Sequence, residues 1–277
     1  MEKKNISIFF NNLRGLELYK FLSKKKQYNI DVYLSKKNLN KSLLTKLKNY
    51  QIIKKIDEKL IENIKKKKYF LNIAAGWPLK FPSKLIHAAR KGTINLHAGK
   101  LPEYRGGSPL NWQIIEGKEK IYISIIKMTI GLDAGPIYIE KSLNLKSSEN
   151  IKDLHNKVNK VYPYMTEKVI KDIKKNKKPK KQLSKNVRYM KQRSDIDGQI
   201  DWVNMNSKDV FNLVRAVSKP YPGAFYKNEK KIYRIFKCKQ ISLKKKFNPG
   251  TILYRNKYKI ITCKKNAIKI IKELKFN

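Results

Sequence analysis

The sequence predicts an α/β protein with a Rossmann-like, mostly parallel sheet and helices on both faces, followed by a smaller β-rich domain. In the first half of the chain, short apolar strands alternate with polar helical stretches, which is the pattern of βαβ units. Residues 69–76 are apolar on both faces, as a buried parallel strand requires. Towards the C-terminus, most segments alternate apolar and polar residues, which is typical of half-buried strands.

The elements of the first half follow from this alternation. Strands are expected at 5–10, at 28–34, around Ile52 and Ile53, at 69–76 and at 93–97. Helices are expected at 16–24, in the Lys-rich stretch that follows residue 34, and at 81–92. The last of these has Pro82 and Ser83 in its first turn and Gly92 beyond its end, which are ordinary start and stop signals.

A long amphipathic helix is expected at 148–176. Its apolar residues at helical spacing are Ile151, Leu154, Val158, Tyr162 and Met165. Pro163 falls inside this helix and predicts a kink or a split. The charged run 176–186 contains Pro179 and reads as a solvated linker.

The C-terminal part is expected to contain one helix at about 206–218, a turn at 219–225, and then strands. The strand candidates are 230–241, 250–254, 257–263 and 267–274. We therefore predict one domain at 1–186 and a second, smaller and β-rich domain at 187–277.

A length of 277 residues is typical of one or two domains. The formal net charge is +44, from 65 Lys and Arg against 21 Asp and Glu. Only 8 of the basic residues are Arg, whereas phosphate and base recognition favour Arg. Abundant Lys, Asn and Ile indicate an AT-rich coding sequence that fills permissive surface positions. The charge alone is therefore weak support for a nucleic-acid partner.

Compartment and metal content also follow from the sequence. Cys238 and Cys263 are too few for a disulfide scaffold and lack the spacing of metal ligands, so we expect free thiols and no metal. The N-terminal apolar stretch is too short for a signal peptide. No stretch approaches the length of a membrane span. We expect a soluble cytoplasmic protein without membrane contact.

Residues 94–140 differ from the rest of the chain. Their five basic and five acidic residues give no net charge, and they contain six of the 12 glycines. Asn95 and His97 lie two apart at a strand end and so share one face, at the edge where open α/β sheets bind ligands. Asp133 lies in a turn between Gly131 and Gly135.

These three residue types suit acyl transfer to a nitrogen nucleophile without a covalent enzyme intermediate. Asn95 can donate to a developing oxyanion, and His97 can transfer a proton near neutral pH. A carboxylate such as Asp133 can orient an imidazole and raise its pKa. The alternative is structural, since a strand-end His is often only hydrogen-bonded and an Asp between glycines is often only a turn residue.

The motifs resemble those of the folate-dependent formyltransferases. The chain has Asn-x-His at 95–97, Leu-Pro-x-Tyr-Arg-Gly at 101–106 and Leu-Asp-x-Gly at 132–135, in the family's order. The similarity continues from 197–202 to 215–225, which resembles the start of the family's C-terminal, OB-like domain. The resemblance thus implies a formyltransferase catalytic domain at 1–186 and an OB-like C-terminal domain at 187–277. The resemblance implies an enzyme that transfers a formyl group from N10-formyltetrahydrofolate to an amine.

By this resemblance, Asn95, His97 and Asp133 are the catalytic residues, with His97 or Asp133 as the proton acceptor. The folate-binding residues carried over by position are Gly76, Trp77, Pro78 and Leu79, together with Asp133.

The acceptor is expected to be the amine of a nucleotide-linked sugar. The segment Ser108–Trp112 reads SPLNW, which looks like the sugar enzymes, among them the one that acts on UDP-4-amino-4-deoxy-L-arabinose. Tyr104, Arg105 and Trp112 are the candidate sugar-binding residues, although Trp112 could equally belong to the core. The family also implies a possible homodimer through the C-terminal domain.

Two alternatives remain open. The first is a methionyl-tRNA formyltransferase, supported by a net charge of +15 over residues 226–277. The second is a basic nucleic-acid-binding protein without catalysis, which needs exposed aromatic platforms. Phe247, Tyr254 and Tyr258 are candidates, but their strand-like surroundings make core positions at least as plausible.

Overall fold

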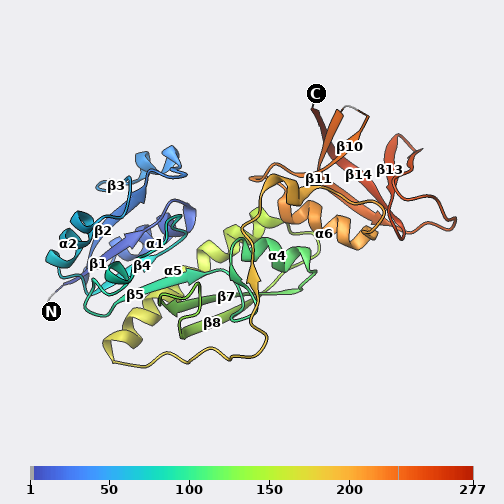
Figure 1. Cartoon of the computed structure of the whole chain (residues 1–277). Coiled ribbons are helices and arrows are strands. Elements are labelled where there is room, and N and C mark those ends of the chain that lie inside the picture. Colours follow the sequence, from blue (N-terminus) through green and yellow to red (C-terminus); the bar gives the residue numbers. More distant parts are fainter. Residues whose placement is uncertain (1–2, 230, 277) are drawn as a thin grey trace. The chain divides into compact units, whose positions relative to one another are not determined.

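A computed structural model describes residues 3–229 and 231–276, which fold into two compact units (Figure 1). The first unit contains the residues up to Gly106 together with Tyr122–Ser142 and Asn156–Tyr189. The second contains Gly107–Ile121, Leu143–His155 and the residues from Met190 onward. The units interleave along the sequence, and the division between residues 186 and 187 stays a prediction about domains.

A seven-stranded sheet, with the strand order β3-β2-β1-β4-β5-β7-β8, is the frame of the first unit. Its strands are β1 (Lys4–Phe9), β2 (Tyr28–Ser35), β3 (Gln51–Ile53), β4 (Leu71–Ala74), β5 (Thr93–His97), β7 (Lys120–Lys127) and β8 (Ile137–Asn144). The first five pair in parallel, and β7 runs antiparallel to β5. The predicted mostly parallel sheet is confirmed.

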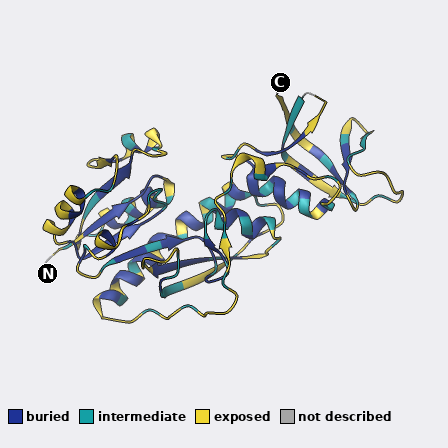
Figure 2. Cartoon of the chain, viewed as in Figure 1, coloured by how far each residue is buried: buried dark blue, intermediate teal, exposed yellow. Residues whose placement is uncertain are grey.

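Helices cover both faces of this sheet. The chain moves from β1 to β2 through α1 (Leu13–Ser23), and returns from β3 to β4 through α2 (Glu58–Lys66). Because such crossovers are right-handed, opposite directions of travel place α1 and α2 on opposite faces. On the α2 face, a buried cluster joins strand residues such as Phe9 and Tyr33 to the helices. Figure 2 shows the inner strands of the sheet largely buried and the outer helix surfaces exposed.

The helix α5 (Ile151–Lys174) is continuous through Pro163, so the predicted split does not occur. The five apolar residues that predicted its inner face are all buried. It contacts α1 through an edge-to-face pair of Phe21 and Tyr164, whose ring centroids lie 4.9 Å apart.

Two other predicted helices differ in the structure, one in its length and one in its type. The stretch 81–92 contains only one helical turn, α3 (Ser83–Ile86). Strand side chains take the carbonyl groups that a longer helix would use, since Asn72 Nδ2 donates to Leu85 and Thr93 Oγ1 donates to Ile86. The Lys-rich stretch after residue 34 forms a 3-10 helix, η1 (Lys41–Lys46), in which only Leu43 is buried. Without an apolar stripe, an α-helix there has little tertiary packing to stabilise it.

The second unit contains a five-stranded antiparallel sheet with the order β10-β11-β14-β13-β12. Its strands are β10 (Ala224–Asn228), β11 (Lys231–Ile241), β12 (Ile252–Arg255), β13 (Tyr258–Thr262) and β14 (Ala267–Phe276). Residue 230, the first of the predicted strand 230–241, lies outside the described residues. The helix α6 (Ser207–Val217) packs against β11 and against α4 (Pro109–Ile115). The predicted β-rich second part is confirmed.

Three short elements complete the described chain. They are β6 (Arg105–Gly106), its partner β9 (Tyr189–Met190) and the 3-10 helix η2 (Asp195–Gly198). None of the described helices is long and apolar enough to cross a membrane. Within residues 3–229 and 231–276, no group of three or more His, Cys, Asp or Glu side chains is arranged to hold a metal ion.

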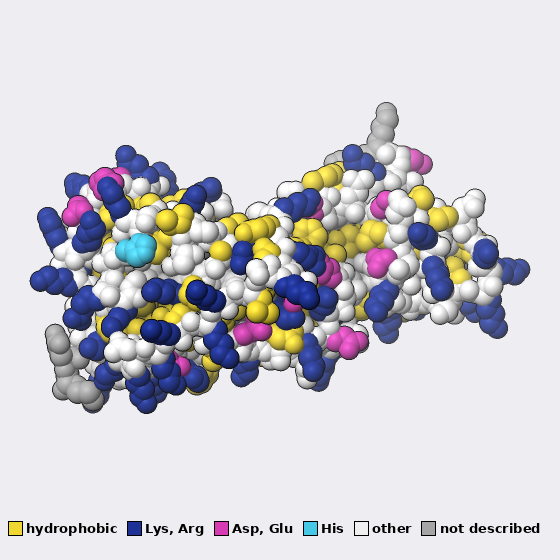
Figure 3. All heavy atoms as spheres, turned by 60° about the horizontal axis from the view of Figure 1, so that its bottom comes forward, with side chains coloured by type: hydrophobic (Ala, Val, Ile, Leu, Met, Phe, Trp, Pro, Cys, Tyr) yellow, Lys and Arg dark blue, Asp and Glu magenta, His cyan; other side chains and the backbone are white. Residues whose placement is uncertain are grey.

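The surface carries the positive charge. Figure 3 shows Lys and Arg side chains over the visible face and few Asp and Glu. The three aromatic residues that we treated as possible core are exposed instead: Phe247 by 41%, Tyr254 by 76% and Tyr258 by 45%. Tyr254 and Tyr258 flank the turn that joins β12 to β13, where side chains near the end of a short hairpin have little to pack against.

Candidate active site

Asn95 and His97 lie at the carboxyl end of β5, where the sheet changes from parallel to antiparallel pairing. The two-residue step brings both side chains to Asp133. Asn95 Nδ2 donates to Asp133 Oδ1 at 3.0 Å, and His97 Nδ1 lies 3.3 Å from Asp133 Oδ2. The structure therefore brings together Asn95, His97 and Asp133, which we call the trio.

The turn that carries Asp133 has an unusual backbone. Asp133 has a φ of +46°, in the left-handed region that Asp and Asn tolerate better than most residues. A Cβ on Gly135 would lie 1.7 Å from the Lys127 carbonyl oxygen, so this position requires glycine. The backbone N–H of Gly106 donates to Asp133 Oδ2 at 2.9 Å. Together these contacts direct the carboxylate at Asn95 and His97.

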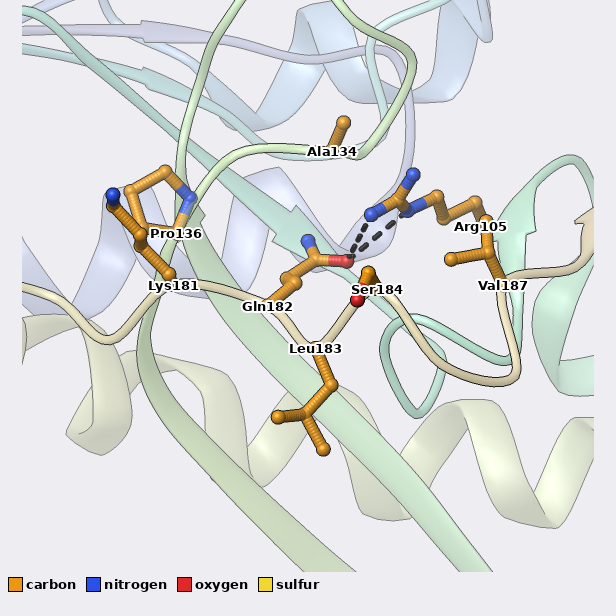
Figure 4. Close-up of a pocket in the computed structure, with 8 residues that line it drawn as sticks. All are labelled: Arg105, Ala134, Pro136, Lys181, Gln182, Leu183, Ser184 and Val187. Atoms are coloured by element: carbon orange, nitrogen blue, oxygen red, sulfur yellow. Dashed lines mark hydrogen bonds between the residues drawn. The ribbon is translucent and has the colours of Figure 1, made fainter.

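Gln182 fixes the same turn from outside. Its Nε2 donates to the carbonyl oxygens of Asp133 and Gly135, both at 2.7 Å. Its Oε1 accepts from Arg105 Nε and Nη2, at 3.1 and 2.8 Å. Figure 4 shows these two side chains pointing at one another beside a cavity of about 430 Å³. Sequence reasoning treated 176–186 as a solvated linker and missed this role.

The imidazole of His97 is buried, and its protonation follows from its partners. A carbonyl oxygen can only accept a hydrogen bond, so His97 Nε2, which lies 2.6 Å from the Tyr104 carbonyl oxygen, carries a proton. In the neutral ring, the lone pair is then on Nδ1, facing Asp133. Burial lowers the pKa of His97, and the positive charge of Arg14 lowers it further. The Asp133 carboxylate and the hydrogen bond to the Tyr104 carbonyl oxygen oppose this shift.

Arg14 and Tyr162 also belong to this environment and were missed. Arg14 Nη1 donates to the Leu96 carbonyl oxygen at 3.2 Å, between the two strand residues of the trio. Its guanidinium lies over the Tyr162 ring, 5.1 Å from the centroid. Arg14 Nε and the Tyr162 hydroxyl are buried and have no hydrogen-bond partner among the described residues. Burial raises the pKa of Tyr162 above its usual value.

The predicted folate-binding segment, Gly76–Leu79, follows β4 and is half-buried. Gly76 has a φ of +74°, and a Cβ there would collide with the Asn12 side chain. The Trp77 ring lies edge-on to Phe9 and Phe81. Its Nε1 is buried without a hydrogen-bond partner in the described chain. This donor and the loop backbone could serve a flat, polar heterocycle.

The three predicted sugar-binding residues have different surroundings. Tyr104 is almost fully buried in the first unit. Arg105 donates to Gln182 and, through Nη1, to the Tyr189 hydroxyl at 3.0 Å. Trp112 lies in the second unit on α4, where its Nε1 donates to the Lys191 carbonyl oxygen at 3.0 Å.

Comparison with known proteins identifies the class to which this site belongs. Residues 19–170, more than half of the chain, match the family model described as formyl transferase. The chain belongs to the formyl transferase family. Residues 193–277 match the formyl transferase C-terminal domain. The predicted protein family is confirmed, and the roles of the individual site residues stay predictions.

Relatives of this chain include the bifunctional polymyxin resistance protein ArnA of Wigglesworthia glossinidia brevipalpis. The two are 36% identical over 228 residues, which are 81% of this chain and 33% of ArnA. The methionyl-tRNA formyltransferase of Caldanaerobacter subterraneus is 28% identical over 200 residues, which are 72% of this chain and 64% of that protein. The chain thus spans less than two thirds of the length of either relative.

Among solved structures, a 4-N formyltransferase from Francisella tularensis superposes on this chain with a TM-score of 0.68. It is 27% identical, and the match covers 82% of this chain and 93% of that one.

Proposed function

We propose that this formyl transferase moves a formyl group from N10-formyltetrahydrofolate to the amino group of a nucleotide-linked sugar. The observation that carries the proposal is the geometry of the trio, in which a carboxylate lies between an amide donor and an imidazole. These three groups are those that formyl transfer to nitrogen needs, and they stand in the motifs of the family to which the chain belongs.

Asn95 would stabilise the negative charge that develops on the formyl oxygen. Its Nδ2 has two hydrogens, and Asp133 Oδ1 uses one of them. The second is available to the oxygen of the reacting carbonyl. Because Asp133 fixes the amide orientation before the substrates bind, no reorganisation is required when the charge develops.

His97 and Asp133 together would accept the proton that the amine loses. When His97 is neutral with its proton on Nε2, the lone pair of Nδ1 faces a carboxylate oxygen at 3.3 Å, so two acceptors face each other. One proton placed between Nδ1 and Oδ2 relieves their repulsion. The pair therefore acts as one base. His97 and Asp133 share the accepted proton, so it belongs to neither residue alone.

The Gly76–Leu79 segment suits the pterin of the donor, because it offers backbone groups and the unpartnered Trp77 Nε1. When bound, the donor supplies a formyl carbon that is open to attack by an amine. The segment would hold the heterocycle, and the trio would act on the carbonyl and on the amine proton.

A 4-amino sugar is the acceptor that we expect. One neighbour of 27% identity is described as a 4-N formyltransferase. The segment Ser108–Trp112 fits the sugar enzymes by resemblance. Contacts of Tyr104, Arg105 and Trp112 with the sugar stay predictions, and so does a homodimer through the C-terminal part.

A second candidate function is formylation of methionyl-tRNA. Many relatives are described as methionyl-tRNA formyltransferases. In addition, the exposed Tyr254 and Tyr258 flank Arg255 and Lys257 in the β12–β13 hairpin, an aromatic and basic surface of the kind that contacts nucleic acid. Binding through several phosphates weakens steeply with salt, whereas a sugar diphosphate is much less sensitive.

The deciding experiment supplies N10-formyltetrahydrofolate and either methionyl-tRNA or a panel of 3-amino and 4-amino sugar nucleotides. Mass spectrometry detects addition of a formyl group. We expect formylation of a 4-amino sugar nucleotide, with no effect of Tyr254→Ser or Tyr258→Ser. The sugar proposal would be refuted if only the tRNA were formylated and if Tyr254→Ser and Tyr258→Ser lost this activity. Asn95→Ala and His97→Ala should lose most turnover while remaining folded.

A further inference from the structure

We propose that Gln182 is a positioning residue that sets the location of Asp133. Arg105 then serves to orient Gln182, in place of the sugar contact predicted for it from the sequence. This inference rests on the proposed function only in treating Asp133 as catalytic. It gives a role to the segment 176–186, which lies outside the recognised motifs.

The side-chain amide of Gln182 uses all its hydrogen-bonding groups. Arg105 is purely a donor, so the amide oxygen must face Arg105 and the amide nitrogen must face the turn. That nitrogen then donates both hydrogens, to the carbonyl oxygens of Asp133 and Gly135. The orientation of the amide is therefore dictated by its neighbours.

Arg105 and its neighbour hold Asp133 at two points. The backbone N–H of Gly106, the next residue, binds the Asp133 carboxylate. The Arg105 side chain acts through Gln182 on the Asp133 carbonyl oxygen. One short segment thus fixes both the main chain and the side chain of Asp133. Loss of the contacts from Gly106 or Gln182 would shift the Asp133 carboxylate relative to Asn95 and His97.

The surroundings of Arg105 favour positioning over substrate binding. It is only 9% exposed. Its Nε and Nη2 are committed to Gln182, and its Nη1 to the hydroxyl of Tyr189, whose ring also lies under the guanidinium. Figure 4 shows the Arg105 guanidinium directed at Gln182. A lysine has no planar fork and could not make this set of contacts.

The test compares Gln182→Glu, Gln182→Leu and the control Leu183→Ala. The glutamate variant keeps acceptors for Arg105 but cannot donate to the two carbonyl oxygens, while the leucine variant loses both sets of contacts. Leu183 is adjacent and 73% exposed, so its variant should match the wild type. We expect kcat to fall about 10²-fold in both Gln182 variants, as for a misplaced catalytic group, with KM changed less than about threefold.

A second measurement needs no substrate. The chain has three histidines, and nuclear magnetic resonance titration of His97 in the free protein reports the position of Asp133. We expect the His97 pKa to change in Gln182→Leu and to stay at the wild-type value in Leu183→Ala. Melting temperatures confirm that each variant is folded. The double variant Arg105→Met/Gln182→Leu should lose no more kcat than either single variant, because the two side chains act as a unit.

The outcomes separate the two proposals. If the wild type formylates an amino sugar and both Gln182 variants stay within twofold of its kcat, with an unchanged His97 titration, the positioning role is wrong. An equal loss in Leu183→Ala would also overturn it. If the wild type formylates no amino sugar, the proposed function fails, while the His97 titration still decides the role of Gln182.

Discussion

Replacement of Asp133 by Asn should inactivate the site without unfolding it. Asn tolerates the left-handed backbone of this position as Asp does. However, the two carboxylate oxygens accept separately from Asn95 Nδ2 and Gly106 N. An amide has only one oxygen, so one of these donors must face an NH₂ group. An unsatisfied buried donor costs about 1–3 kcal/mol, which is the expected loss of folding stability.

The effect on catalysis should be larger. With its NH₂ group towards His97, residue 133 would donate to Nδ1 and occupy the lone pair that accepts the proton. Loss of a general base lowers kcat by about 10²- to 10⁴-fold, or about 3–5 kcal/mol in activation free energy. Asp133 raises the pKa of His97, so its removal should lower that pKa and move any remaining acidic limb of the rate profile to lower pH.

Steady-state formylation across pH and titration of His97 check this reasoning. Asp57→Asn is a matched control, because Asp57 caps α2 with a bond to Leu60 N that Asn can also accept. That variant should keep full activity. Turnover of Asp133→Asn within about threefold of the wild type, or a higher His97 pKa, would show that the shared-proton account is wrong.

Three further predictions concern charge, packing and thiol reactivity. Arg14→Met removes a cation that lowers the pKa of His97, so the acidic limb of the pH–rate profile should move to higher pH; an unmoved limb would contradict this. Gly135→Ala forces a Cβ to within 1.7 Å of a backbone oxygen and should cost about 1–3 kcal/mol, measured by denaturant unfolding, together with most activity. Burial raises the pKa of Cys238 and Cys263 to about 12, so neither should react with a thiol reagent at pH 8 until the chain unfolds; rapid labelling of the native protein would disagree.

The trio was predictable because its signals are local. Thr93–His97 forms a strand with the predicted bounds, and the two-residue step between Asn95 and His97 follows from strand geometry. Asp133 could be found from its glycine-flanked turn. Such patterns depend on a few neighbouring residues, so one sequence is enough to detect them.

Residues that act across long separations were not predictable in this way. Gln182 reaches Asp133 over 49 positions, and Arg14 reaches Leu96 over 82. Nothing in a lysine-rich, proline-containing stretch marks Gln182 as special. Arg14 did carry a signal, since it is one of only 8 arginines. In a chain where lysine fills permissive positions, a retained arginine indicates a need for its planar guanidinium.

Several other arginines support that interpretation. Guanidinium groups lie over aromatic rings at Arg105, Arg188, Arg193, Arg215 and Arg234. A retained arginine is therefore a composition signal that could have marked Arg14, although it does not state which ring or which carbonyl an arginine meets.

The hydrogen bonds around Asp133 also bear on how the protein folds. The carboxylate is bonded by residues 38 and 27 positions away, and its carbonyl oxygen by one 49 positions away. Contacts of such separation form only after the loops between them have closed. During refolding, the site should therefore assemble late, after the local helices and the first strand pairs. Formyl transfer would then report the completed fold, and a partly folded chain would hold neither the carboxylate nor its proton in place.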